Sequence, residues 1–197
     1  TGSDNVAIGI TALSANTTGG NNTAVGASAL FDNTTGYANV AVGGGALANN
    51  TTGFGNVSIG LNSMSANTAG EDNVSIGCRS MDANTSGNCN TFVGKDAGLS
   101  NTVGFRNSGF GIKAGENVTT GDQNVFLGFE SGAQGGMVNI TTEDNRLVAG
   151  HSNITNSYVK VDWTVTSDLR DKTNFGTVPH GLDFVNQLQP VSFQFRT

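Results

Sequence analysis

The chain has 197 residues and a formal net charge of −6, and only 12% of its residues are charged. This low charge and the lack of a basic patch argue against electrostatic binding to nucleic acid, and no run of eighteen apolar residues exists that would span a membrane. The 29 glycines are about twice the usual share, yet apolar residues recur at fixed places, which a disordered composition does not show.

A 17-residue repeat fills the first two thirds of the chain. Words of the type Asn-Val-Ala-Ile-Gly begin, without a slip, at Asn5, Asn22, Asn39, Asn56, Asn73, Asn90, Asn107 and Asn124. A second Asn, followed by Thr, recurs at Asn16, Asn33, Asn50, Asn67, Asn84 and Asn101. Self-similarity at one fixed period is typical of a protein built from stacked repeats.

Each 17-residue copy is predicted to hold two short strands and two turns. The residues after the first Asn alternate between β-branched and small, which predicts a short strand, and the Asn-Thr-Thr-Gly segment is turn chemistry in which Asn and Gly tolerate positive φ. One copy is too short to bury its own apolar face and must stack on the next. The sequence therefore predicts an all-β fold, a β-solenoid of eight coils about 4.8 Å apart and roughly 38 Å long. The repeated Asn should form a ladder of side-chain amides.

The large apolar residue of the repeat changes its position along the chain. The position two after the first Asn is small in copies one to five, where the position eight after it is Leu or Met. Copies six and eight reverse this, with Phe92 and Gly98, and with Phe126 and Gly132. Because a close-packed interior resists both voids and excess volume, we expect the two positions to share one core space. In copy seven, where both positions are Gly, we expect Phe110 to supply the bulk.

The Asn-Val-Ala-Ile-Gly and Asn-Thr-Thr-Gly motifs of the repeat resemble the head repeats of trimeric autotransporter adhesins and, more closely, the repeat arrays of phage tail-fibre proteins. The resemblance covers about residues 4–135 and implies a trimer of β-rolls packed around a three-fold axis. We assign residues 1–140 to the repeat solenoid. The resemblance also implies that other tail-fibre or baseplate proteins are partners and that a host cell-surface polysaccharide is a ligand.

The repeat fails after Asn124. The next strand-like word, Asn145-Arg-Leu-Val-Ala-Gly, comes later than the repeat predicts, and an alternating strand follows from Tyr158 to Thr166. We interpret residues 141–166 as a β cap that ends the solenoid. Beyond it, apolar residues at three-residue spacing predict a short helix before Pro190, and a strand follows, so a short α/β segment ends the chain.

Residues 167–197 contain the words SDLRDK and GLDFVNQLQPVSFQFR, which resemble the start of the endosialidase-type intramolecular chaperone, a self-cleaving domain. The resemblance implies that Ser167 and Lys172 form a cleaving dyad and that the cut falls between Thr166 and Ser167. A Ser hydroxyl needs such a base, and Lys acts as one only when its pKa is lowered, for which Arg170 is a candidate neighbour. Asp168 is a candidate for orienting these cations.

The chain ends at Thr197, early in that domain, so we expect a truncated chaperone in an uncut fragment, and, because Thr1 follows no signal-like segment, a processed or partial chain. The predicted function is a structural and host-attachment segment of a phage tail fibre, located in the virion. Any enzymatic activity is expected to be autoproteolysis alone.

An alternative is a bacterial adhesin or another free-standing binding solenoid, which the Thr residues after the second Asn favour. No cofactor or metal site is expected. Cys78 and Cys89 are predicted to be free and at least half-buried thiols, and His151 and the scattered acidic residues form no recognisable cluster.

Overall fold

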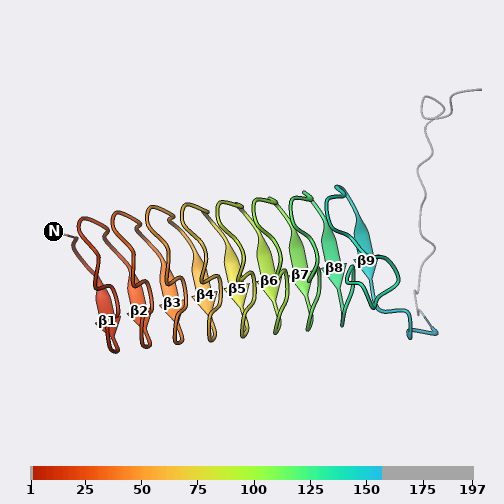
Figure 1. Cartoon of the computed structure of the whole chain (residues 1–197), viewed down its shortest axis with the longest axis horizontal. Helices are drawn as coiled ribbons and strands as arrows, with labels where there is room; N and C mark the ends of the chain where they lie inside the picture. The colour runs from red at the N-terminus through yellow and green to blue at the C-terminus, as the bar shows by residue number, and fades with distance from the viewer. Residues whose placement is uncertain (1, 157–197) are drawn as a thin grey trace, which may run out of the picture. The chain divides into compact units, whose positions relative to one another are not determined.

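A computed structural model describes residues 2–156, which form an all-β solenoid. Its nine strands are β1 (Val6–Ile8), β2 (Thr23–Val25), β3 (Val40–Val42), β4 (Val57–Ile59), β5 (Val74–Ile76), β6 (Thr91–Val93), β7 (Ser108–Phe110), β8 (Val125–Leu127) and β9 (Leu147–Ala149). All lie parallel in one sheet in sequence order, one strand from each coil (Figure 1). The predicted all-β solenoid of 17-residue coils is therefore confirmed. The second strand predicted for each coil was wrong, because within residues 2–156 each coil contributes one strand and the rest of the coil is turns and bends.

Residues 157–197 form a separate unit of the chain. The strand predicted from Tyr158, the short helix and the final strand lie outside the described residues. The boundaries proposed for the three parts of the chain stay predictions.

Each strand pairs with the next at the spacing of the repeat, as Val40 does with Val57, until the last pair. We number coils 1 to 8 from the eight first Asn residues and count positions from that Asn as position 0. The last step is longer, because Val125 pairs with Leu147. Strand β9 belongs to a further coil, coil 9. The strand-like word was expected to begin at Asn145, but Arg146 stands at position 0 of this coil. The five extra residues fall between Gly132 and Ile140, where the coil bulges before it rejoins the stack.

Two columns of Asn side chains bind successive coils together, where the sequence had predicted one ladder of side-chain amides. The position-0 column is buried from Asn22 onward, and each Oδ1 accepts the backbone N–H of the next Asn at 2.8–3.1 Å. In the second column, at position 11, each Nδ2 donates to the Oδ1 of the Asn in the preceding coil at 2.8–2.9 Å. Both Nδ2 groups of one coil also donate to one Gly carbonyl, as Asn39 and Asn50 do to Gly53. Each of coils 1 to 6 is therefore held together internally, and bound to its neighbours, by the same amides.

The position-11 column ends at Asn101, because Val118 and then Ile140 occupy the equivalent places in the next two coils. Asn101 Oδ1 is consequently the one buried side-chain polar atom in residues 2–156 without a hydrogen-bond partner. The interior thus changes from polar to apolar at this column, and the change leaves one unsatisfied acceptor.

The glycines have a different role from the one that turn chemistry suggests. Gly53 and its equivalents at position 14 do not have positive φ, but a Cβ there would lie against the Asn amides and the carbonyl of the next coil. Positive φ falls instead at positions 4, 6, 8 and 16, including the core residues Leu30 at 51° and Met64 at 50°. Glycine at position 14 is therefore required by close approach, not by backbone conformation.

The core exchange along the repeat is confirmed. Leu30 and Phe92 belong to one buried cluster, and a Cβ on Gly98 would stand 2.8 Å from the Phe92 ring. The expectation for coil 7 was wrong, because Phe110 is 46% exposed. Its core space is filled from both neighbours by Phe92 and Phe126, whose ring centroids lie 6.4 Å apart. Coil 7 therefore depends on coils 6 and 8 for its core.

Replacing Asn50 by Ala should lower the free energy of unfolding by about 2–4 kcal/mol, because buried partners in both neighbouring coils lose a hydrogen bond. Asn49→Ala is the matched control, since the adjacent Asn49 is exposed. Urea denaturation measures both. Equal losses in the two variants would mean that the column does not stabilise the stack.

Phe92→Ala should cost about 3–5 kcal/mol, and Gly98→Leu alone should destabilise by overpacking. The double variant should be more stable than Phe92→Ala, because it restores the arrangement of coil 2, where Leu30 has a positive φ similar to that of Gly98. Thermal unfolding of the three variants tests this. A double variant no better than the worse single one would show that the two positions do not share a space.

Candidate functional site: the outer face of the sheet

The residues predicted to carry self-cleavage lie outside the described part of the chain. They are Thr166, Ser167, Asp168, Arg170 and Lys172, so the fold gives no distance between them. The surface of residues 2–156 therefore provides the geometry for a functional argument.

The outer face of the sheet is apolar along all nine strands. The middle residue of each strand from β2 to β9 points into the core, whereas the residues on either side of it, at positions 1 and 3, point outward. Position 1 holds Val6, Thr23, Val40, Val57, Val74, Thr91, Ser108, Val125 and Leu147. Position 3 holds Ile8, Val25, Val42, Ile59, Ile76, Val93, Phe110, Leu127 and Ala149. We call these eighteen residues the outer sheet face.

This face has the composition of an interior. A sheet with one face in water normally alternates apolar and polar residues, but neither column contains a charged residue. Ile8 is 60% exposed, Leu147 56% and Phe110 46%. Position 5 widens the face with Ile10, Leu61, Ile112 and Phe129 and interrupts it with Lys95 in coil 6. A continuous apolar stripe of this length is typical of a surface that another protein covers.

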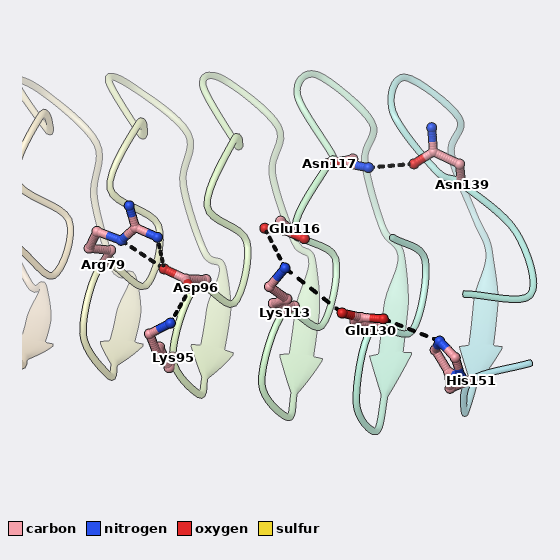
Figure 2. Close-up of polar contacts among 9 residues, drawn as sticks. All are labelled: Arg79, Lys95, Asp96, Lys113, Glu116, Asn117, Glu130, Asn139 and His151. Carbon is pink, nitrogen blue, oxygen red and sulfur yellow. Dashed lines mark hydrogen bonds and ion pairs between the residues drawn. The ribbon is translucent and has the colours of Figure 1, made fainter. Parts of the chain in front are cut away.

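The turn after the sheet carries a column of charges that sequence analysis missed. Position 6 is Arg79, Asp96, Lys113 and Glu130 in coils 5 to 8, and His151 lies next to Glu130 in coil 9 (Figure 2). An Arg79 amino nitrogen lies 2.7 Å from Asp96 Oδ1. Lys113 Nζ lies 3.8 Å from Glu130 Oε1, and His151 Nε2 lies 3.2 Å from Glu130 Oε2. We call these five residues the charge column.

Asp96 is the most enclosed member of the charge column, with 2% of its side chain exposed. Burial acts to raise the pKa of its carboxyl, but hydrogen bonds from Lys95 and Arg79, together with their charges, outweigh burial and lower the pKa. The pKa of Glu143 is also lowered, chiefly because its carboxylate accepts the backbone N–H of Thr141. Asp96 is therefore held in its charged form by its two cations.

The charge column could have been found from the sequence. Its first four members recur at the spacing of the repeat and alternate in sign, but the acidic residues were read as scattered and His151 as isolated. His151 in fact contacts both Glu130 and the ring of Phe129, at a centroid distance of 5.5 Å. Sorting charged residues by their place in the repeat is the step that would have revealed the pattern.

The Thr residues of the repeat have a structural role. Each Thr at position 12 donates its hydroxyl to the carbonyl of the Thr in the next coil, as Thr34 does to Thr51 at 2.9 Å. These hydroxyls are thus used between coils, which weakens the alternative of a ligand-binding Thr surface. Cys78 is half-buried as predicted, but Cys89 is exposed because it lies at the outward-facing position before Asn90.

Over residues 2–156, no group of three or more His, Cys, Asp or Glu side chains comes together in a way that could hold a metal ion. The same part of the chain has no helix that is long and apolar enough to cross a membrane.

The lowered pKa of Asp96 predicts a pH dependence. A carboxyl whose pKa is lower in the folded state stabilises above its unfolded pKa of about 3.9, and this stability is lost as the pH falls through the folded value. Asp96→Asn should therefore flatten the fall in unfolding free energy below about pH 4, by about 1 kcal/mol since its partners are half exposed. Urea denaturation between about pH 7 and 2.5 measures this.

The matched control is Asp32→Asn, since Asp32 makes no ion pair within residues 2–156. If Asp96→Asn retained the wild-type slope, other carboxylates would account for the acid sensitivity.

Comparison with known proteins identifies one part of the chain. Residues 167–197 match the model of the peptidase S74 family, described as the chaperone of endosialidase. No curated protein and no solved structure matches the chain. The chain therefore joins a β-solenoid to a segment similar to the start of an endosialidase-type chaperone, in agreement with the resemblance noted for that segment.

Proposed function

We propose that the chain is a structural segment of a phage tail fibre in which three copies pack through the outer sheet face. The observation that carries the proposal is the apolar character of that face over all nine strands. Burying apolar surface is the main driving force of association, and three copies around one axis would each cover the face of the others. The opposite side of each coil, at positions 9 and 10, carries polar residues such as Asp32, Asn49 and Asp82 and would remain in water.

The match at residues 167–197 supports the choice of a tail fibre. Each strand of a parallel solenoid must pair with a strand one full coil away, and the chain exposes its apolar face while it folds. A chaperone segment attached to the end of the rod would hold the three chains together while their coils stack. Attachment to the host, in the virion, is then the role of the assembled fibre, with other tail-fibre or baseplate proteins beside it and a surface polysaccharide as its ligand.

The same segment would release itself by a peptide-bond rearrangement. Ser167 Oγ would attack the carbonyl carbon of Thr166 while Lys172 takes the hydroxyl proton. The C–N bond to Ser167 would break as the C–O bond forms, and the freed amine would receive a proton. Water would then hydrolyse the ester to give a Thr166 carboxylate and an amino-terminal Ser167. The nucleophile needs no binding step because it neighbours its target in the chain.

The trimer is tested by light scattering on the whole chain. The wild type should give three chains per particle. Ile59→Glu should shift the chain toward monomer, because a charge at the centre of the outer sheet face would be buried without a partner. Asn49→Glu, on the polar side of a neighbouring coil, should leave three chains. A monomeric wild type, or equal loss of assembly in both variants, would exclude this face as the interface.

Self-cleavage is tested by the intact mass of a product that is extended beyond Thr197 by a complete chaperone domain. A cut between Thr166 and Ser167 is expected in the wild type and should be abolished in Ser167→Ala and Lys172→Ala. Ser157→Ala and Lys160→Ala are the matched controls and should be cut normally. A wild type that stays uncut would remove the enzymatic part of the proposal while leaving the trimer untouched.

A further inference from the structure

The repeat creates a pairing problem that the Asn columns cannot solve. Every coil from 1 to 7 offers the same backbone register and the same position-0 Asn to its neighbour. A chain that skipped one coil, leaving one full repeat looped out, would form the same hydrogen bonds at the new junction. Strand register is weakly specified when neighbouring segments are alike, so something else must select the correct order.

Coils 1 to 4 contain little that would distinguish them. Their position-6 residues are Thr11, Ser28, Gly45 and Asn62, all uncharged. Their core residues are also nearly interchangeable, with a small residue at position 2 and Leu or Met at position 8. Skipping a coil in this half therefore brings together residues of the same kind.

The charge column distinguishes coils 5 to 8, because its sign alternates from each coil to the next. In the native order Arg79 meets Asp96, and Lys113 meets Glu130 (Figure 2). Skipping coil 6 would place Arg79 beside Lys113, and skipping coil 7 would place Glu130 beside the enclosed carboxylate of Asp96. An enclosed charge next to a like charge is poorly compensated. Such a contact disfavours the wrong neighbour more than exposed pairs stabilise the right one.

The core makes the same selection in the same coils. Coil 7 has Gly109 and Gly115 at its two core positions, and its space is filled by Phe92 from coil 6 and Phe126 from coil 8. Placed beside coil 5, coil 7 would lose the Phe92 ring and leave a void. In the native order the two rings are spread over two coil-to-coil spacings. Omitting coil 7 would crowd both rings into one spacing and overpack the core.

We propose that coils 5 to 8 form a register key, in which the charge column and the shared core of coils 6 to 8 prevent the skipping of a single coil and so set the register at this end of the stack. The key acts within one chain and does not depend on the trimer. It lies next to the end of the solenoid from which residues 157–197 continue, so coils added from this end would start in the correct register.

The test is to exchange two charges without changing composition. In the double variant Asp96→Lys and Lys113→Asp, the native order has like charges adjacent at two steps, and skipping either coil makes opposite charges meet. Hydrogen–deuterium exchange by mass spectrometry should then show two populations over coils 6 and 7, one of which has lost protection over the length of one coil. The neutral double variant Asp96→Asn and Lys113→Gln is the matched control and should keep one population. A single population in the exchanged variant, or two in both, would overturn the proposal.

A second measurement uses the unmodified chain, in case the exchanged variant does not fold. Pulsed hydrogen exchange during refolding should show mixed protection in coils 2 to 4 and a single pattern in coils 5 to 8. Register errors that are equally frequent in both halves would contradict the key.

Discussion

The structure depends on one arrangement, the convergence of two Asn side-chain amides on a Gly carbonyl in each of coils 1 to 6. A three-residue strand joins only part of each coil to the next. Backbone hydrogen bonds of the turns, such as Leu30 N–H to the Ala46 carbonyl, and the Asn amides join the rest. Because these amides are buried, each must find a partner in the same or the next coil. This requirement fixes the length of the coil and the residue at position 14 as Gly. Where the second Asn is replaced, at Val118, one acceptor is left without a partner.

A polar interior of this kind leaves room for only a narrow apolar core, and the sequence adjusts that core coil by coil. The space that Leu or Met fills from position 8 is filled by Phe from position 2 in coils 6 and 8. Coil 7 contributes neither and relies on its neighbours. The apolar residues that a globular protein would bury lie instead on the outer sheet face. The fold therefore has two apolar surfaces, one enclosed by the chain itself and one that is complete only beside other chains.

Most of the fold was predictable because a local sequence pattern that is weak in one copy recurs in eight copies. The period, the strand after the first Asn, an Asn ladder and the exchange between Leu30 and Phe92 all follow from comparing equivalent positions, whereas a second strand in each coil was wrongly predicted. Other features depend on contacts that a single copy does not contain. The core of coil 7 is filled by side chains of the neighbouring coils and not by Phe110. The sequence also did not show where the five extra residues before Arg146 lie. The predicted catalytic residues rest on resemblance and on the match at residues 167–197 alone.

The Asn columns also give the rod a direction. In both columns the amide N–H groups point toward the preceding coil and the oxygens toward the following one, so their dipoles add head to tail as peptide dipoles do in a helix. The donor end then lies at Asn5 and the acceptor end at Asn124, whose oxygen accepts the backbone N–H of Arg146. An acid, Asp4, stands beside the first end and a base, Arg146, takes the place of the ninth Asn at the second. The sequence thus has an acid next to the donor end of this side-chain macrodipole and a base at its acceptor end.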